Sequence, residues 1–165
     1  MSVVWFTASF NYFVLSFLVS TFCKPFVAGI SLGVADMIAF GVAGIVYEKV
    51  GTKVSLGTGF AIATMAGVLI ILFGLQRDDS AFFIFLVFSA RLGISFAFCI
   101  VFVAHSSLFP VLFSATAFGF LNFWARLFSG FSMELTMVEE PYPMLVFTGS
   151  SILALMLSCG LQKNP

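Results

Sequence analysis

The sequence predicts an all-α membrane protein with six transmembrane helices, and three observations lead to this prediction. Of the 165 residues, 61% are hydrophobic and only 8% are charged, whereas an ordinary soluble domain has about 25% charged residues. Apolar stretches of about 20 residues, the length that crosses a bilayer, recur along the whole chain. The connections between them are short, so neighbouring helices run antiparallel and no soluble domain fits between them.

Each predicted span has at most one interior charge. The six spans lie at about residues 3–22, 26–47, 54–75, 81–104, 111–133 and 144–161, and they form a single domain over residues 1–165. Asp36 lies in the second span, Arg91 in the fourth and Arg126 in the fifth. Prolines are expected between spans, where they cost least: Pro25, Pro110, Pro141 and Pro143.

The charges inside the spans are the best candidates for a functional site. A central arginine costs roughly 2.5–3.5 kcal/mol to insert, so Arg91 and Arg126 should face protein, a water-filled cavity or a bound anion. Asp36 is the only acidic residue deep in a span. Two cations against one anion favour an anionic or zwitterionic ligand. Alternatively, Asp36 is the charge partner of one arginine, and the other arginine snorkels or caps a carbonyl.

Several residues inside the spans are suited to hold helices together. Asn11, Tyr12 and Asn122 are polar residues among apolar ones, and they either hydrogen-bond a substrate or bridge helices. Gly29 and Gly33 form a small-xxx-small pair in the second span, a spacing that permits close helix contact.

No pattern in the chain indicates an enzyme, a cofactor or a metal site. The single histidine, His105, lies at the end of the fourth span, where we expect an interfacial residue, with proton coupling as the alternative. The cysteines have no metal or redox spacing: Cys23, Cys99 and Cys159. The net charge is zero, which gives no electrostatic reason to expect a nucleic-acid partner.

The basic residues favour one orientation in the bilayer. If the spans alternate, Lys49, Lys53 and Lys163 lie on one side and Lys24 and Arg77 on the other. This small excess predicts that the connection after the second span and the C-terminus are cytoplasmic.

The connection after the second span carries a pattern of glycines and charges. It resembles the G-x-x-x-D-R-x-G-R-R/K loop of the major facilitator superfamily, with an acid at Glu48 and basic residues at Lys49 and Lys53. The resemblance implies a gating loop in which an acid at a helix end meets helix termini and basic groups. The residues of this loop are Gly44, Glu48, Lys49, Gly51 and Lys53.

Within that superfamily, the chain resembles the organic cation, organic anion and carnitine transporters over essentially its whole length. Residues 5–13 read W-F-T-A-S-F-N-Y-F, similar to the W-F-x-x-S-F-x-Y-Y of the family's seventh span. Residues 91–98 read R-L-G-I-S-F-A-F, similar to the K-x-G-x-x-x-x-F of its tenth span. Residues 125–130 read A-R-L-F-S-G, similar to the A-R-x-G segment of its eleventh span.

The resemblance implies a site, a mechanism and a missing partner. It implies alternating-access transport of small organic ions across the plasma membrane by a multi-pass protein. Arg126 is similar to the arginine of the anion and carnitine branches. Because the chain matches only the second half of a twelve-span fold, its partners besides lipid and substrate are a missing N-terminal half or a second copy. The implied substrate-binding residues are Tyr12, Phe13, Arg91, Phe98 and Arg126.

Several positions depart from the family pattern. Ser107 stands where the family has Glu, Val111 where it has Thr, and Ser114 where it has Arg, while the second tyrosine of the seventh span is Phe13. These losses favour a second hypothesis, in which the chain is a transport-incompetent module that associates with partner membrane proteins. A third hypothesis is a half-size transporter that self-associates.

Overall fold

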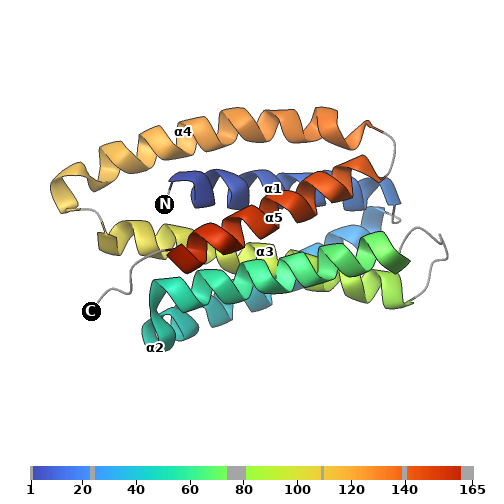
Figure 1. The fold of residues 1–165 in the computed structure, drawn as a ribbon, viewed down its shortest axis with the longest axis horizontal. Coiled ribbons are helices and arrows are strands. Elements are labelled where there is room, and N and C mark those ends of the chain that lie inside the picture. Colours follow the sequence, from blue (N-terminus) through green and yellow to red (C-terminus); the bar gives the residue numbers. More distant parts are fainter. Residues whose placement is uncertain (1, 23–24, 74–80, 109, 139–140, 161–165) are drawn as a thin grey trace.

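The protein is built from α-helices, as the composition predicts. The computed structural model describes residues 2–22, 25–73, 81–108, 110–138 and 141–160, and no strand occurs among them. Figure 1 shows the helices packed side by side in one bundle. They are α1 (Ser2–Phe22), α2 (Pro25–Phe73), α3 (Ala81–Leu108), α4 (Val111–Thr136) and α5 (Tyr142–Gly160).

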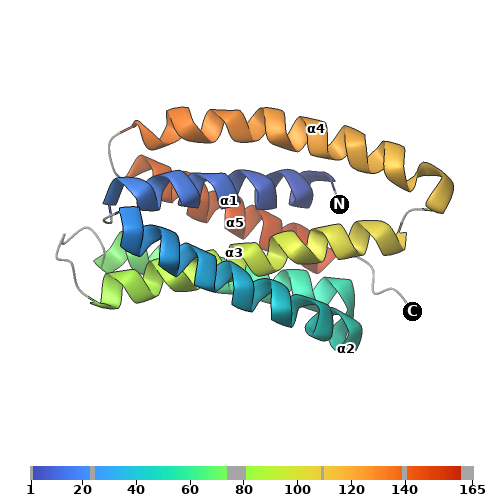
Figure 2. The same cartoon turned by 180° about the vertical axis from the view of Figure 1, so that it is seen from behind.

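Helix α2 consists of two helical legs that meet at Gly51. Gly51 has φ 76° and ψ 177°, a backbone conformation that glycine adopts without steric cost. The ribbon reverses direction at this bend, so the legs lie antiparallel in both views (Figures 1 and 2). The predicted second and third spans correspond to the two legs. The prediction of a loop between them is wrong, because the residues on both sides of Gly51 are helical.

Within the described ranges of the chain, four helices are long and apolar enough to cross a membrane, which gives the fold the character of an all-α membrane protein. The qualifying segments are Ser2–Val19, Gly29–Phe73, Phe82–Ser107 and Tyr142–Gly160. The predicted count of six is not reached, because both legs of α2 fall in one segment and α4 does not qualify. Helix α4 forms where it was predicted, but its polar residues Asn122, Arg126 and Glu134 lower its hydropathy.

The helices alternate in direction along the bundle. The start of α1, the bend of α2 and the end of α5 lie at the same end of the molecule (Figure 1). Helix α3 packs chiefly on α2, α5 packs on α2 and α1, and α4 packs mainly on α1 alone. Helix α1 therefore lies at the centre, between α4 on one side and the other helices on the other.

Two glycines allow α2 and α3 to approach closely. A Cβ on Gly93 would lie 2.7 Å from the backbone nitrogen of Ala63 and 2.8 Å from the carbonyl oxygen of Gly59. The close helix contact that Gly29 and Gly33 would permit is not made within this chain, since a Cβ at either position would meet nothing within 4 Å. The small-residue contact is made by a different pair.

The prolines lie at helix starts. Pro25 is the first residue of α2, and Pro110 is the N-cap of α4. The prediction that prolines lie outside the helices is wrong for Pro25, which begins α2, and for Pro143, which follows the first residue of α5, Tyr142. Both prolines occupy a first turn, where the missing N–H would have no helical partner in any case.

Candidate functional site

Arg91 and Asp36 form a two-pronged ion pair inside the bundle. Arg91 Nε donates to Asp36 Oδ1 and Arg91 Nη2 donates to Asp36 Oδ2, both at 2.8 Å. Arg91 Nη1 also donates to the backbone oxygen of Tyr12 at 2.9 Å and to Ser16 Oγ at 2.6 Å. The Arg91 side chain is only 4% exposed. This pair agrees with the alternative prediction from the sequence, in which Asp36 is the charge partner of one arginine.

Two hydroxyl groups complete the shell around the Asp36 carboxylate. Tyr12 Oη donates to Oδ2 at 2.9 Å, and Ser95 Oγ donates to Oδ1 at 2.5 Å. The ion pair and its hydroxyl partners come from α1, α2 and α3, so a polar cluster joins three helices. We call Tyr12, Ser16, Asp36, Arg91 and Ser95 the charge cluster.

The ring of Tyr12 connects this cluster to other aromatic side chains. The guanidinium carbon of Arg91 lies 3.6 Å from the Tyr12 ring centroid, within the range of a cation–π contact. Phe98 stacks on Tyr12 with the centroids 5.2 Å apart, and Phe13 meets Tyr12 edge-on at 5.6 Å. Three predicted substrate residues, Tyr12, Arg91 and Phe98, are therefore engaged with one another.

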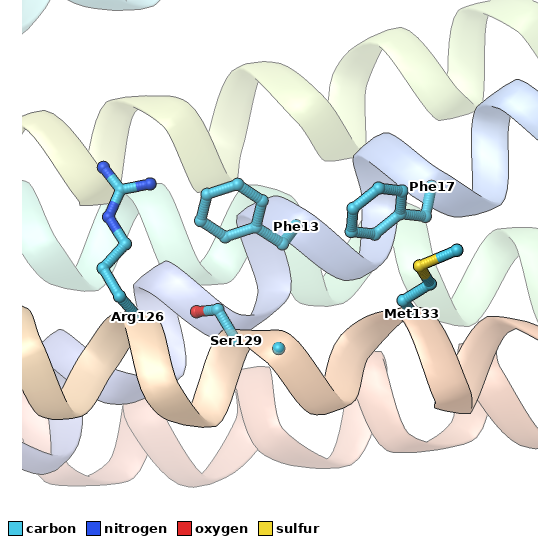
Figure 3. A pocket seen from close by; sticks show the side chains of 6 residues that line it. Phe13, Phe17, Arg126, Ser129 and Met133 are labelled. Carbon is cyan, nitrogen blue, oxygen red and sulfur yellow. The ribbon is translucent and has the colours of Figure 1, made fainter.

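Arg126 lies in a different environment, at a pocket between α1 and α4. The pocket has a volume of about 280 Å³, and Figure 3 shows the Arg126 side chain beside Phe13, with Phe17 and Met133 further along. The guanidinium carbon of Arg126 is 5.2 Å from the Phe13 ring centroid. The pocket is lined by Phe13, Phe17, Arg126, Ser129, Gly130 and Met133.

Arg126 differs from Arg91 in burial as well as in pairing. Arg126 is exposed in the bundle, whereas Arg91 is buried. Among the residues that the structure describes, the one ion pair formed is that of Arg91 with Asp36. Of the two arginines, Arg126 is therefore the one without a carboxylate partner.

Sequence reasoning missed several residues of both sites. Ser16 and Ser95 escape notice because hydroxyls are common in membrane helices, yet each follows a cluster residue, Tyr12 or Arg91, by four positions. The other pocket residues also follow Arg126 or Phe13 at the three-, four- and seven-residue spacing that puts side chains on one helix face. They are Phe17, Ser129, Gly130 and Met133.

The predicted gating residues do not form a charge network. Gly44, Glu48 and Lys49 are exposed and Lys53 is half-buried, and none of the charged ones forms an ion pair with another described residue. The bend carries a neutral contact instead, in which the hydroxyls of Tyr47 and Ser107 lie 2.7 Å apart. Ser107 is the position at which the resemblance expects Glu, and it forms a contact between two neutral hydroxyls.

Three other polar residues singled out in the sequence lie inside or partly inside the bundle. Asn11 bridges helices, since its Nδ2 donates to the Phe147 oxygen at 3.3 Å and to Ser151 Oγ at 2.9 Å. Asn122 is half-buried. His105 lies in the last turn of α3 and is buried in the bundle: its Nε2 is 3.1 Å from the Ser114 oxygen, and its ring meets Trp5 edge-on.

The chain is not matched by any protein-family model, nor by any curated protein. Cys99 and Cys159 are free thiols, and Cys23 lies outside the described residues.

Proposed function

We propose that this chain carries small organic ions, preferably anions, across a membrane as one half of an alternating-access transporter. The Arg126 pocket carries the proposal: a cation on α4 lines a cavity together with the rings of Phe13 and Phe17. A charged side chain in a membrane segment is costly. A functional role, such as binding a ligand of opposite charge, explains why the segment contains one. A phenyl-lined pocket with one cation suits an ion with an apolar body and a negatively charged group.

The size of the pocket favours a small substrate. Its volume of about 280 Å³ is near the lower end of the range for small-molecule sites. Phe13 and Phe17 offer ring surfaces, and the Arg126 guanidinium offers a planar fork that matches a carboxylate. A compact aromatic carboxylate satisfies all three features.

Six membrane crossings are part of the proposal. Each leg of α2 crosses the bilayer once, and α4 crosses with Arg126 turned toward the pocket and not toward lipid. We propose that this arrangement is the C-terminal half of a major facilitator transporter of the organic-ion type, which the sequence motifs resemble. The pocket residues Phe17, Arg126 and Met133 are exposed, so a second half, from a longer chain or a second copy, would close the cavity over them. We propose a plasma-membrane location and no enzymatic activity.

A second candidate function is that of a transport-incompetent module that binds partner membrane proteins. The hydroxyl contact between Tyr47 and Ser107 supports it, because the charged gate that the resemblance implies is replaced there. The two candidates differ in whether the purified protein moves an ion.

Uptake by proteoliposomes tests the proposal. We expect the complete gene product to take up radiolabelled benzoate saturably, and Arg126→Ala to reduce that uptake at least about tenfold, the value of a hydrogen bond to a charged group. Leu127→Ala is the matched control, because Leu127 is on the same helix, is exposed and does not line the pocket. Benzoate uptake that Arg126→Ala leaves unchanged, or no uptake by inserted protein, contradicts the proposal.

A further inference from the structure

The donors of Arg91 are almost all in use. A guanidinium has N–H donors on Nε, Nη1 and Nη2, and all but one of those on Arg91 are engaged by Asp36, Tyr12 and Ser16. The residue is 3% exposed. An anion could reach Arg91 only by breaking bonds that already satisfy it.

The Asp36 carboxylate is equally occupied. Each of its oxygens accepts two hydrogen bonds, one from Arg91 and one from the hydroxyl of Tyr12 or Ser95. It therefore offers no free acceptor to the cationic group of a zwitterion. Neither member of the pair presents net charge to a ligand.

The charge cluster is nevertheless close to the pocket. The Tyr12 ring contacts both the Arg91 guanidinium, at 3.6 Å, and the Phe13 ring, at 5.6 Å. Phe13 in turn contacts Arg126 at 5.2 Å on the pocket wall. Two aromatic rings in contact thus separate the neutralised arginine from the unpaired one. Arg91 is thus a second cation that connects to the pocket wall through the Tyr12 and Phe13 rings and does not itself line the pocket, and its charge is neutralised by Asp36.

We propose that Asp36 is a specificity-determining residue, which masks Arg91 so that the pocket presents a single positive charge and selects monoanions over dianions and zwitterions. Arg91 is then a positioning residue for Tyr12 and not a ligand of the substrate. When the Asp36 charge is removed, the Arg91 guanidinium becomes a second anion site beside the first. This inference rests on the proposed function, because it assumes that Arg126 binds an anion.

Binding of two probes of matched ring structure tests the inference. Benzoate carries one carboxylate and terephthalate carries two, at opposite ends of the same ring. We expect the complete protein in detergent to bind benzoate more tightly than terephthalate. Asp36→Asn keeps the side-chain shape but removes the charge, so it should raise the terephthalate-to-benzoate affinity ratio at least about tenfold, the value of one charge-assisted hydrogen bond.

Variants of Arg91 should change the terephthalate-to-benzoate affinity ratio in the opposite direction, and they also provide the control. Arg91→Gln leaves the Asp36 carboxylate without its partner near the pocket, so it should lower the ratio, because a dianion is repelled more than a monoanion. The double variant Asp36→Asn with Arg91→Gln removes both charges together, and it should restore the ratio of the unmodified protein. A purely structural role of Asp36 would weaken both probes alike.

The possible results separate the two proposals. If the unmodified protein binds neither probe, or binds both independently of Arg126, the proposed function and this inference fail together. If Arg126-dependent binding is present but Asp36→Asn leaves the ratio unchanged, this inference alone fails. If Asp36→Asn does not fold, the other two variants still test the inference. An unchanged terephthalate-to-benzoate affinity ratio in Arg91→Gln overturns it, and so does an altered ratio in the double variant.

Discussion

The two arginines of the membrane helices differ in nearly every physical respect. Arg91 is buried, binds one carboxylate with two nitrogens and is enclosed by three helices. Arg126 is exposed beside a pocket and contacts a phenyl ring. The comparison shows that one charge is neutralised and joins helices, whereas the other has no carboxylate partner among the described residues and lies at a pocket. A guanidinium buried among helices needs such a counter-charge, and an exposed one does not.

Removal of the Asp36 carboxylate should produce the largest loss of stability. Asp36→Ala leaves the buried guanidinium of Arg91 without a counter-charge, and we expect the free energy of unfolding in detergent to fall by about 3–5 kcal/mol. Arg126→Ala removes an exposed charge and should cost less than about 1 kcal/mol. Denaturant titration followed by circular dichroism measures both. Equal losses in the two variants would show that Arg91 and Arg126 are not differently placed.

The close approach of α2 and α3 should also distinguish the two regions. Gly93→Ala places a methyl group 2.7 Å from the Ala63 nitrogen, so we expect a loss of about 1–3 kcal/mol from overpacking. Gly130 lines the pocket and has nothing within 4 Å of its added Cβ. Gly130→Ala should therefore be neutral or stabilising by up to about 1 kcal/mol. Thermal unfolding of the pair provides the measurement, and a destabilised Gly130→Ala would contradict the open pocket.

The hydrogen bonds between α1 and α5 should contribute a smaller amount. Asn11→Ala breaks the bonds to the Phe147 oxygen and to Ser151, and each interhelical contact of this kind is worth about 1 kcal/mol in membrane proteins. Asn122→Ala is the matched amide truncation, on the half-buried face of α4, and should cost less than about 0.5 kcal/mol. If Asn122→Ala is the more damaging variant, the role assigned to Asn11 is wrong.

Removal of the contact between Arg126 and Phe13 should have the smallest effect, and the effect is on benzoate affinity. Phe13→Ala removes a cation–π partner at 5.2 Å, a contact worth about 0.5–1 kcal/mol. Benzoate affinity should then fall about threefold. Phe131→Ala, an exposed phenyl truncation on α4 outside the pocket, should leave affinity unchanged. A loss of the same size in both variants would remove Phe13 from the site.

The helices could be predicted from sequence better than their boundaries. Long apolar runs locate α1, α3, α4 and both legs of α2 within a few residues, because lipid-length helices need such runs. The charges at residues 48–53 predict a loop, but these residues are helical on both sides of Gly51. The backbone needs only one residue to reverse direction, and Gly51 supplies it with its positive φ.

The charged residues of the site could be predicted from the sequence, but which of them pair with each other could not. Asp36, Arg91 and Arg126 are visible as charges in apolar spans, so each was a candidate. Which arginine the carboxylate meets depends on the rotation of α2 against α3, and spacing within one helix does not contain that information. The tight packing at Gly59 and Gly93 is what brings these helices together, and only the three-dimensional structure shows it.

The central claim is that Arg126, and not Arg91, is the charge that binds the ligand. Benzoate titration of the purified protein tests it most directly, with Arg126→Ala compared against the neutral double variant Asp36→Asn with Arg91→Gln. We predict that Arg126→Ala weakens benzoate binding by about tenfold or more, whereas the double variant binds within about twofold of the unmodified protein. Equal weakening by both, or weakening by the double variant alone, would contradict the account.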